Sequence, residues 1–320
     1  MNDLPALRWG LLGAARIARS VLVPALRAAG QEIVAVAARD PARAADFAAD
    51  FGIGSRPDYQ ALVDDPAIDA IYIALTNDAH LPWTVAALEV GKHVLCEKPL
   101  ALTAAEVETM RAAEARSGKL LMEAFCHIFH PRFPDVLNLV KANSLGDLVT
   151  IEVSFTNPLR DPNDFRTSRA LGGGAAYDLM GYCGTLATLV AGRQPRSVVA
   201  RQTLGGEVDI ATAATLDFGG LLASLQASFI GTRQQRMAII GTRDWIVLEH
   251  PIGNKNREVI LRVGDTARTY AQVDPYRLMV ENFVAAVGGR KPLFFPSSAS
   301  LDQARLMDRI RQAASTGVAT

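Results

Sequence analysis

The apolar positions of the first 125 residues alternate between short unbroken runs and stripes at helical spacing. The first run covers residues 7–12. The stripe after it consists of Ile17, Val21, Leu22, Ala25 and Leu26. Further strand-like runs lie at residues 32–38, 70–75, 94–96 and 119–125. Strands that alternate with helices are typical of a parallel sheet covered on both faces, so we predict a doubly wound α/β domain over residues 1–125.

From residue 126 onward the pattern changes to strands with one polar face. Residues 131–140 are amphipathic and helical, and two more helices are expected near residues 276–287 and 298–314. The expected strands are 148–155, 196–202, 211–218, 221–229, 236–241, 245–249 and 258–263. This half, residues 126–320, is predicted to be an α+β domain with a mostly antiparallel open sheet.

Turn and cap residues divide the predicted elements. Asp40 followed by Pro41 is typical of a helix start, and Gly52 of its end. Residues 103–106 resemble a capping box, and residues 217–220 read as a hairpin turn between two strands.

Composition restricts the classes of function. The chain has 320 residues, 49% hydrophobic and 21% charged, with 33 basic and 33 acidic residues, so it is long enough for two domains. Because no run of like charge stands out, we expect neither a nucleic-acid nor a membrane partner. No signal peptide or long apolar segment is evident, which favours a cytoplasmic protein. Cys96, Cys126 and Cys183 lie far apart, without the spacing of a metal site, so we expect no metal and treat them as core thiols.

The turn after the first strand, residues 13–18, reads G-A-A-R-I-A. Small residues here let backbone amides and a helix N-terminus approach a pyrophosphate, which makes Gly13, Ala15, Arg16 and Ile17 candidates for cofactor binding. The alternative is that the small residues only permit close packing of helix against strand.

The tip of the second strand distinguishes two cofactors. An acidic residue usually stands there to bind the ribose hydroxyls of NAD, but this strand ends in Ala37-Ala38-Arg39. Asp40 is better explained as a helix cap. Arg39, with Arg16 beside it, therefore indicates NADP rather than NAD, because guanidinium suits a phosphate. The alternative is a solvated Arg39.

Two loops after later strands carry polar residues where a ligand of an open α/β sheet lies. Thr76, Asn77 and His80 follow the strand at 70–75, and their alternative role is local capping. Glu97 and Lys98 follow the strand at 94–96; alone, they would be explained as an exposed ion pair.

A glycine-rich stretch, residues 172–174, precedes Asp178 and Tyr182 in the second domain. On a helix the two side chains share a face. Hydride transfer at a carbinol or carbonyl carbon needs a proton donor or acceptor near its oxygen. We expect Tyr182 to exchange that proton, Lys98 to polarise the oxygen, and Asp178 to orient the substrate. The reverse roles of Lys98 and Tyr182 stay open, as does a structural role for Asp178 and Tyr182.

Together these motifs resemble the glucose-fructose oxidoreductase, inositol dehydrogenase and rhizopine-catabolism (Gfo/Idh/MocA) family of NAD(P)-dependent oxidoreductases. The resemblance covers essentially the whole chain, and its most specific motif is Glu97-Lys98-Pro99. It implies an N-terminal Rossmann domain, a catalytic Lys98, Glu97 near the nicotinamide ribose, and a cis peptide before Pro99. It also implies that the open sheet of the second domain forms a homo-oligomer. Met180 stands where the family has Gly, and Tyr182 resembles the aldose and dihydrodiol dehydrogenase branch.

The resemblance leaves the substrate undetermined. The family's Tyr-Arg pair after the first domain is replaced by His127-Ile128, which suggests an uncharged ligand. The candidate pocket residues are Phe125, Arg166, Tyr177, Trp83, Asp178 and Tyr182; for Trp83 the favoured alternative is a place in the core. We expect a small-molecule substrate, a sugar, cyclic polyol or related hydroxylated or carbonyl compound. The alternative function is a regulator that senses NAD(P) or sugar without turnover.

Overall fold

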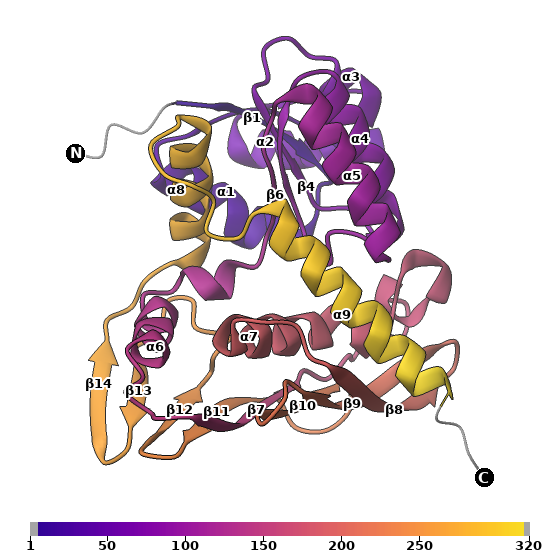
Figure 1. The fold of residues 1–320 in the computed structure, drawn as a ribbon. Coiled ribbons are helices and arrows are strands. Elements are labelled where there is room, and N and C mark those ends of the chain that lie inside the picture. Colours follow the sequence, from indigo (N-terminus) through magenta and orange to yellow (C-terminus); the bar gives the residue numbers. More distant parts are fainter. Residues whose placement is uncertain (1–5, 317–320) are drawn as a thin grey trace. The chain divides into compact units, whose positions relative to one another are not determined.

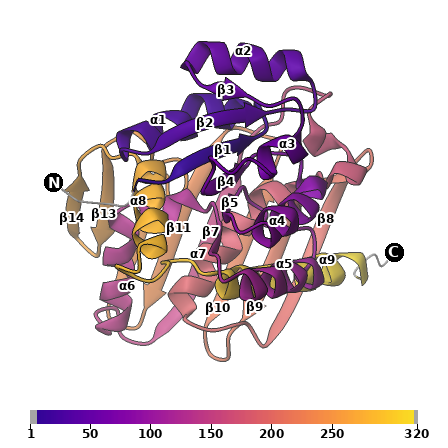
Figure 2. The ribbon, with the colours of Figure 1, turned by 90° about the horizontal axis from the view of Figure 1, so that it is seen from above.

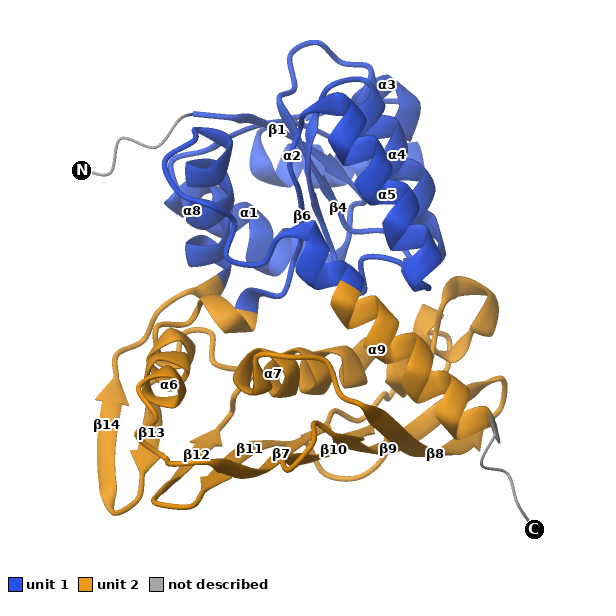
Figure 3. Ribbon diagram, viewed as in Figure 1, with its two compact units in different colours: residues 1–126, 276–301 blue, residues 127–275, 302–320 orange. Residues whose placement is uncertain are grey.

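The computed structural model describes residues 6–316. The described chain forms two compact units (Figure 3). The first contains the residues up to Cys126 together with Tyr276–Leu301, and the second contains His127–Pro275 and the residues from Asp302. The two predicted domains begin and end in residues 1–5 and 317–320, which lie outside the described residues; the predicted absence of a signal peptide also concerns residues 1–5.

The first unit is built on a parallel sheet of six strands in the order β3-β2-β1-β4-β5-β6 (Figures 1 and 2). The strands are β1 (Arg8–Leu12), β2 (Glu32–Ala37), β3 (Gly54–Ser55), β4 (Ala70–Ile73), β5 (His93–Cys96) and β6 (Leu121–Glu123). The central strand β4 is buried along its whole length, as its apolar run predicted. The order reverses between β1 and β4, which confirms the predicted doubly wound α/β sheet.

Two helices of this unit begin at the cap residues expected from the sequence. Asp40 accepts a hydrogen bond from the Ala42 amide, and the helix that follows ends at Gly52 in the left-handed conformation. Thr103 caps the next long helix by accepting from the Glu106 amide. The elements are η1 (Ala18–Leu22), α1 (Val23–Ala28), α2 (Pro41–Phe51), α3 (Tyr59–Val63), η2 (Asn77–Ala79), α4 (His80–Glu89) and α5 (Ala104–Ser117).

A segment from the far end of the chain completes the first unit. It contains α8 (Pro275–Val287) and the start of α9 (Ser297–Thr316). The ring of Phe283 packs against Trp9 with centroids 5.6 Å apart, and Phe295 packs edge-on against Phe125 at 5.5 Å. The sequence analysis placed residues 276–301 in the second domain, and the structure groups them with the first. Periodicity identified the helix but not the distant aromatic rings that it contacts.

The second unit is built on an eight-stranded sheet in the order β14-β13-β12-β11-β7-β10-β9-β8. All neighbouring strands are antiparallel except β7 and β10, which run parallel. The strands are β7 (Leu148–Thr156), β8 (Ser197–Gly205), β9 (Val208–Asp217), β10 (Leu222–Ser228), β11 (Gln234–Gly241), β12 (Trp245–Glu249), β13 (Val259–Val263) and β14 (Thr266–Tyr270). The edge strand β14 was not predicted, because four of its five residues are exposed and it shows no alternation.

Helices cover one face of this sheet, and Figure 2 shows α7 crossing over its central strands. The apolar side of β7 (Ile151, Val153 and Phe155) is buried, whereas its alternate residues are more exposed. The helical elements are η3 (Cys126–Phe129), α6 (Arg132–Lys141), η4 (Phe165–Thr167), η5 (Arg169–Leu171), η6 (Ala176–Met180) and α7 (Gly181–Ala191). Within residues 6–316 the helices are all too short or too polar to cross a membrane.

Candidate active site

The turn after β1 accepts only glycine at its first position. Gly13 is buried with φ +106°, and its amide donates to the Ala37 carbonyl at 2.8 Å. A Cβ at this position would lie 2.4 Å from the Ala74 carbonyl oxygen. The ends of β2 and β4 therefore crowd the turn from both sides. A turn this tight lets backbone amides approach a phosphate closely, so these residues fit the pyrophosphate of a dinucleotide.

The rest of the turn leads into a helix that begins with a π-helical segment, η1. Ala15 and Ile17 are half-buried, and Arg16 is exposed. The Ala15 carbonyl accepts from the Arg19 amide at 3.0 Å. Arg16 therefore adds an exposed cation beside the turn.

The tip of β2 carries positive charge and no available carboxylate. Arg39 is exposed, and its amide donates to the Tyr59 hydroxyl at 3.0 Å. Tyr59 in turn packs edge-on against Trp83 with ring centroids 5.2 Å apart, so Trp83 supports this tip, in line with its alternative role as a packing residue. Arg43, which the sequence analysis did not consider, donates to the Ala14 carbonyl at 3.4 Å.

The three predicted residues after β4 differ in their burial and contacts. Thr76 is half-buried, and Asn77 is buried at the start of η2. His80 is fully buried; its Nδ1 lies 2.8 Å from the Pro99 carbonyl oxygen and its Nε2 3.3 Å from that of Leu75. Burial lowers the pKa of His80, although these carbonyls oppose the effect. We assign the proton of the neutral ring to Nδ1, the shorter contact. His80 therefore joins two loops instead of offering a free N–H to a cofactor.

Residues 97–100, which we call the Lys98 loop, are anchored on three sides. The buried Tyr72 hydroxyl on β4 donates to the Glu97 carboxylate, and His80 binds the Pro99 carbonyl. The Leu100 amide donates to the Glu123 carboxylate of β6 at 2.8 Å. The peptide between Lys98 and Pro99 is cis, as the resemblance implied. Lys98 is thus the residue of this loop that lies between anchored neighbours.

Burial sets the protonation of two side chains around the Lys98 loop, Tyr72 and Glu123. Burial raises the pKa of Tyr72 well above its usual value, and the Glu97 charge raises it further. Tyr72 therefore remains protonated and donates. Burial also raises the pKa of Glu123 to about 7, although the Ser300 hydroxyl, the Leu100 amide and the Lys98 charge act in the opposite direction. The loop lies beside a carboxyl group that titrates near neutrality.

The glycine turn of the second unit is as restricted as that of the first. A Cβ on Gly173 would lie 2.4 Å from the Arg166 carbonyl oxygen. Gly174 has φ +115°, and a Cβ there would lie 2.3 Å from an Asp209 carboxylate oxygen. The same Asp209 accepts from the Ala176 amide at 2.8 Å. Asp209 thereby fixes the start of η6, the π-helical segment that carries Asp178.

Asp178 and Arg166 form an ion pair with 3.0 Å between Oδ2 and Nε. Arg166 also pairs with Asp164 at 3.1 Å. Burial alone would lower the pKa of Arg166, but the two carboxylates outweigh it, and the pKa is raised. One guanidinium therefore faces two carboxylates, and this part of the site carries no excess positive charge.

Aromatic edges hold the ring of Tyr182. His127 lies edge-on to it with centroids 5.0 Å apart, and Phe155 lies edge-on at 5.6 Å. His127 and Ile128, the departures from the family's Tyr-Arg pair, are both fully buried. The substitution therefore places an imidazole beside the predicted proton-exchanging tyrosine. Met180, the other departure, is also fully buried.

Two other predicted residues lie elsewhere. Phe125 is 1% exposed and packs on Phe295, which gives it a place in the core of the first unit; its contact with substrate stays a prediction. Tyr177 lies under the Arg311 guanidinium, 4.2 Å from its ring centroid.

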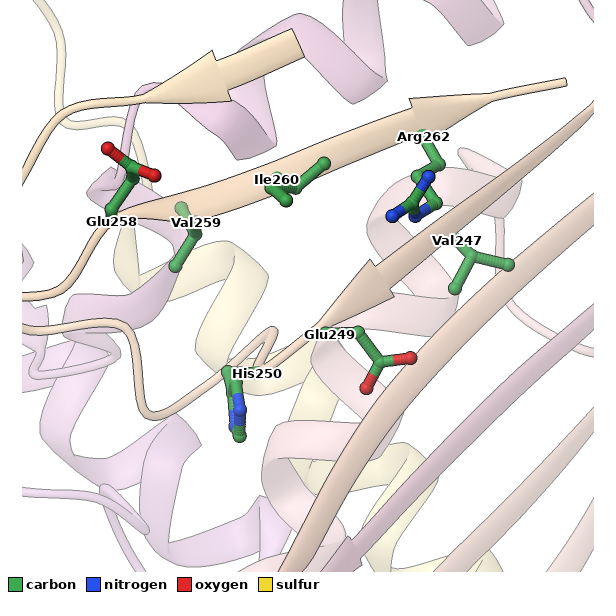
Figure 4. A pocket seen from close by; sticks show the side chains of 7 residues that line it. All are labelled: Val247, Glu249, His250, Glu258, Val259, Ile260 and Arg262. Carbon is green, nitrogen blue, oxygen red and sulfur yellow. The ribbon is translucent and has the colours of Figure 1, made fainter. Parts of the chain in front are cut away.

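A hollow of about 190 Å³ lies on the second unit at β12 and β13 (Figure 4). The residues that line it are Val247, Glu249, His250, Glu258, Val259, Ile260 and Arg262. None of the predicted site residues is among them. Across residues 6–316 the His, Cys, Asp and Glu side chains form no group of three or more that could hold a metal ion.

Sequence reasoning missed four supporting residues: Arg43, Tyr72, Glu123 and Asp209. A charged residue inside an apolar run was the available signal for Glu123, which stands in LLMEAF. Tyr72 gave no comparable signal, because tyrosine is common in strands. The contacts of Arg43 and Asp209 depend on pairings between distant segments.

The chain matches two family models. One is described as an oxidoreductase family with an NAD-binding Rossmann fold (GFO_IDH_MocA) and matches residues 7–125. The other is the GFO/IDH/MocA C-terminal domain and matches residues 133–247.

Similar proteins cover nearly the whole chain. An uncharacterized oxidoreductase of Rhizobium meliloti is 35% identical over 97% of this chain and 98% of that protein. D-xylose 1-dehydrogenase (NADP(+)) of Haloferax volcanii is 32% identical over 98% and 99% of the two chains. The structure of a 3-ketoreductase from Actinomadura kijaniata in complex with NADP and TDP-benzene superimposes with a TM-score of 0.89 and 28% identity, covering 97% of this chain and 98% of that one.

The crowding at Gly13 gives a first prediction. Gly13→Ala should weaken NADPH binding at least about tenfold and lower the melting temperature, because the new methyl group collides with the Ala74 carbonyl. Isothermal titration calorimetry and thermal unfolding measure the two effects.

Gly30→Ala is the matched control, since Gly30 also has a positive φ but nothing within 4 Å of its Cβ position. It should cost only about 1 kcal/mol of stability and leave NADPH affinity unchanged. Equal affinity of Gly13→Ala and wild type for NADPH would contradict the assignment of this turn to the cofactor.

Proposed function

Because this chain belongs to the Gfo/Idh/MocA family of NAD-binding oxidoreductases, we propose that it transfers a hydride between NADP and a carbinol or carbonyl carbon of an uncharged sugar, cyclic polyol or related compound. The observation that carries this proposal is the three-sided anchoring of the Lys98 loop at the carboxyl end of the first sheet. Anchoring of this kind holds a reactive side chain within a narrow range of positions, which is what proton transfer to a substrate requires.

The cofactor would be held by the turn at Gly13, Ala15, Arg16 and Ile17. Arg39 supports NADP over NAD, because it stands where the ribose-binding carboxylate of NAD enzymes stands and Asp40 is used as a helix cap. We add Arg43, whose guanidinium reaches the same turn. Two similar proteins are named with NADP, which agrees with this choice.

On the nicotinamide side, we propose that Thr76, Asn77, Glu97 and Lys98 line the cofactor, with His80 fixing the loops that carry them. When bound, the nicotinamide supplies or accepts the hydride. Glu97 accepts a hydrogen bond from Tyr72, so its carboxylate is oriented before any ligand arrives.

We propose that Lys98, Tyr182 and Asp178 act at one substrate oxygen. Tyr182 exchanges the proton of the substrate hydroxyl, and the Lys98 ammonium polarises the oxygen and favours the phenolate. Asp178, held by Arg166, accepts a hydrogen bond from a substrate hydroxyl and orients the ring. The presence of Lys98 and Tyr182 favours an enzyme over the alternative, a regulator without turnover.

The charges of the second unit support an uncharged substrate. Arg166 is already paired with Asp178 and Asp164, so it is not available to bind a phosphate or carboxylate group. The family's second cation at this site is replaced by the buried Ile128. We therefore place free sugars, polyols and diols before nucleotide-linked sugars.

We also propose that the chain forms a dimer or tetramer through the exposed face of the second sheet. Large apolar residues are exposed on its strands: Val199, Leu222, Ile240, Trp245 and Ile260. Pairing with a second copy would remove these side chains from water. The cytoplasmic location expected from the sequence stays a prediction.

Lys98→Met should retain NADPH binding and lose turnover by a factor of about 10² to 10⁴, because the variant removes the cation but keeps the length of the side chain. Tyr182→Phe should lose turnover to a similar extent. Stopped-flow and steady-state rates with one accepted substrate measure both changes.

Lys141→Met, an exposed lysine at the end of α6, is the control and should behave as wild type. Near wild-type turnover of Lys98→Met would exclude the proposed role of Lys98.

The ratio of kcat/KM with NADPH to that with NADH tests the cofactor assignment. We expect a ratio well above 1 in the wild type, and a reversed ratio in Arg39→Asp, because a carboxylate repels a phosphate and binds a ribose diol. Arg290→Asp changes the charge at an exposed residue outside the proposed cofactor site and should leave the ratio unchanged. A wild-type ratio near 1 would overturn the choice of NADP.

A further inference from the structure

Glu123 is a buried carboxyl group in the first unit that the proposed reaction does not use. It ends β6 and is 2% exposed. Ionisable side chains are almost never buried to this degree without a compensating partner. Its position next to the Lys98 loop therefore needs an explanation.

Four kinds of polar or charged group surround Glu123. One carboxylate oxygen accepts from the Leu100 amide at 2.8 Å, and the Ser300 hydroxyl of α9 is a neighbour. Cys96 of β5 is its partner in the strand register, and the charges of Glu97 and Lys98 act on it. Glu123 thus faces one cation, one carboxylate, one thiol and one hydroxyl.

Lys98 and Glu123 attract each other. The Lys98 ammonium favours the ionised form of Glu123, as an opposite charge nearby does. The Leu100 amide, two residues from Lys98, adds a hydrogen bond between Glu123 and the loop. Glu123 therefore acts on the position of the lysine through both its charge and this hydrogen bond.

We propose that Glu123 is a positioning residue for Lys98, which fixes the Lys98 loop through the Leu100 amide and, when ionised, attracts the lysine ammonium as its opposite charge. This inference rests on the role of Lys98 in the proposed function. The groups that act on the titration of Glu123 are the Ser300 hydroxyl, the Leu100 amide and the charges of Lys98 and Glu97.

A consequence for pH follows, because burial raises the pKa of Glu123 from 4.5 to about 7. Turnover falls on the acidic side as Glu123 takes up a proton near neutral pH. Between pH 4.5 and about 7 the folded state binds more protons at Glu123 than the unfolded state does. The contribution of Glu123 to the free energy of unfolding therefore decreases as pH rises, whereas turnover increases. A residue with a purely structural role would not produce these opposite pH dependences.

Glu123→Gln is the variant that separates these effects, since an amide oxygen still accepts from Leu100 but the charge is absent. At pH 8 we expect kcat to fall about tenfold with the Kd for NADPH unchanged, and the acidic limb near neutral pH to disappear. The melting temperature at pH 8 should equal or exceed that of the wild type. Glu123→Ala, which also loses the hydrogen bond, should lose more activity.

Asp69→Asn is the matched control, because Asp69 also accepts from a backbone amide, that of Arg8, just before β4 begins. It should lower stability and leave the pH profile of kcat unchanged. A Glu123→Gln enzyme with a wild-type pH profile, or one that loses activity only in proportion to a lowered melting temperature, would overturn the inference.

A second measurement does not depend on turnover. Glutamate side chains labelled with ¹³C at the carboxyl carbon titrate visibly by NMR, and the Glu123→Gln variant identifies the Glu123 signal. The pKa of Glu123 should be higher in Lys98→Met than in the wild type, because the Lys98 charge lowers it. An unchanged titration of Glu123 would contradict the coupling. Absence of turnover in the wild type would count against the proposed function alone, since the titration still reports on Glu123 and Lys98.

Discussion

Buried polar groups at the carboxyl end of the first sheet must find hydrogen-bond partners, and the candidate site depends on how they do so. Tyr72, His80 and Glu123 are buried on three different elements, and each would lose several kcal/mol of solvation without a partner. All three find their partner in residues 97–100. These three hydrogen bonds restrict the loop to one conformation, in which Lys98 lies between anchored neighbours.

In the second unit, glycines at a crowded turn position the groups assigned to chemistry. Its turn at residues 173–174 is crowded by the Arg166 backbone and the Asp209 carboxylate, which leaves no room for a Cβ. Because Asp209 also holds the Ala176 amide, the helix that carries Asp178 starts at one defined point. Aromatic edges from His127 and Phe155 then restrict the Tyr182 ring. In both units, steric crowding and buried hydrogen bonds position the groups assigned to chemistry.

Local signals predicted the elements and the motifs well, because caps, glycines and apolar periods act over a few residues. Asp40, Gly52 and Thr103 all mark helix ends as expected. What the sequence did not reveal depends on contacts between distant segments: the packing of Phe283 on Trp9, the burial of Phe125, and the anchors supplied by Tyr72 and Glu123. His80 illustrates the difference. The sequence placed it in a polar loop, whereas the structure buries it at the start of α4 with both ring nitrogens facing backbone carbonyls.

The central claim, an NADP-dependent oxidoreductase for uncharged hydroxylated compounds, is tested most directly by one set of rates. NADPH oxidation and NADP reduction are followed at 340 nm against a panel of aldoses, ketoses, inositols and diols, with their phosphorylated and nucleotide-linked counterparts alongside. The account predicts turnover with at least one uncharged compound, and a lower kcat/KM for its anionic counterpart. Binding of NADPH without turnover of any compound, or turnover of anionic sugars only, would contradict it.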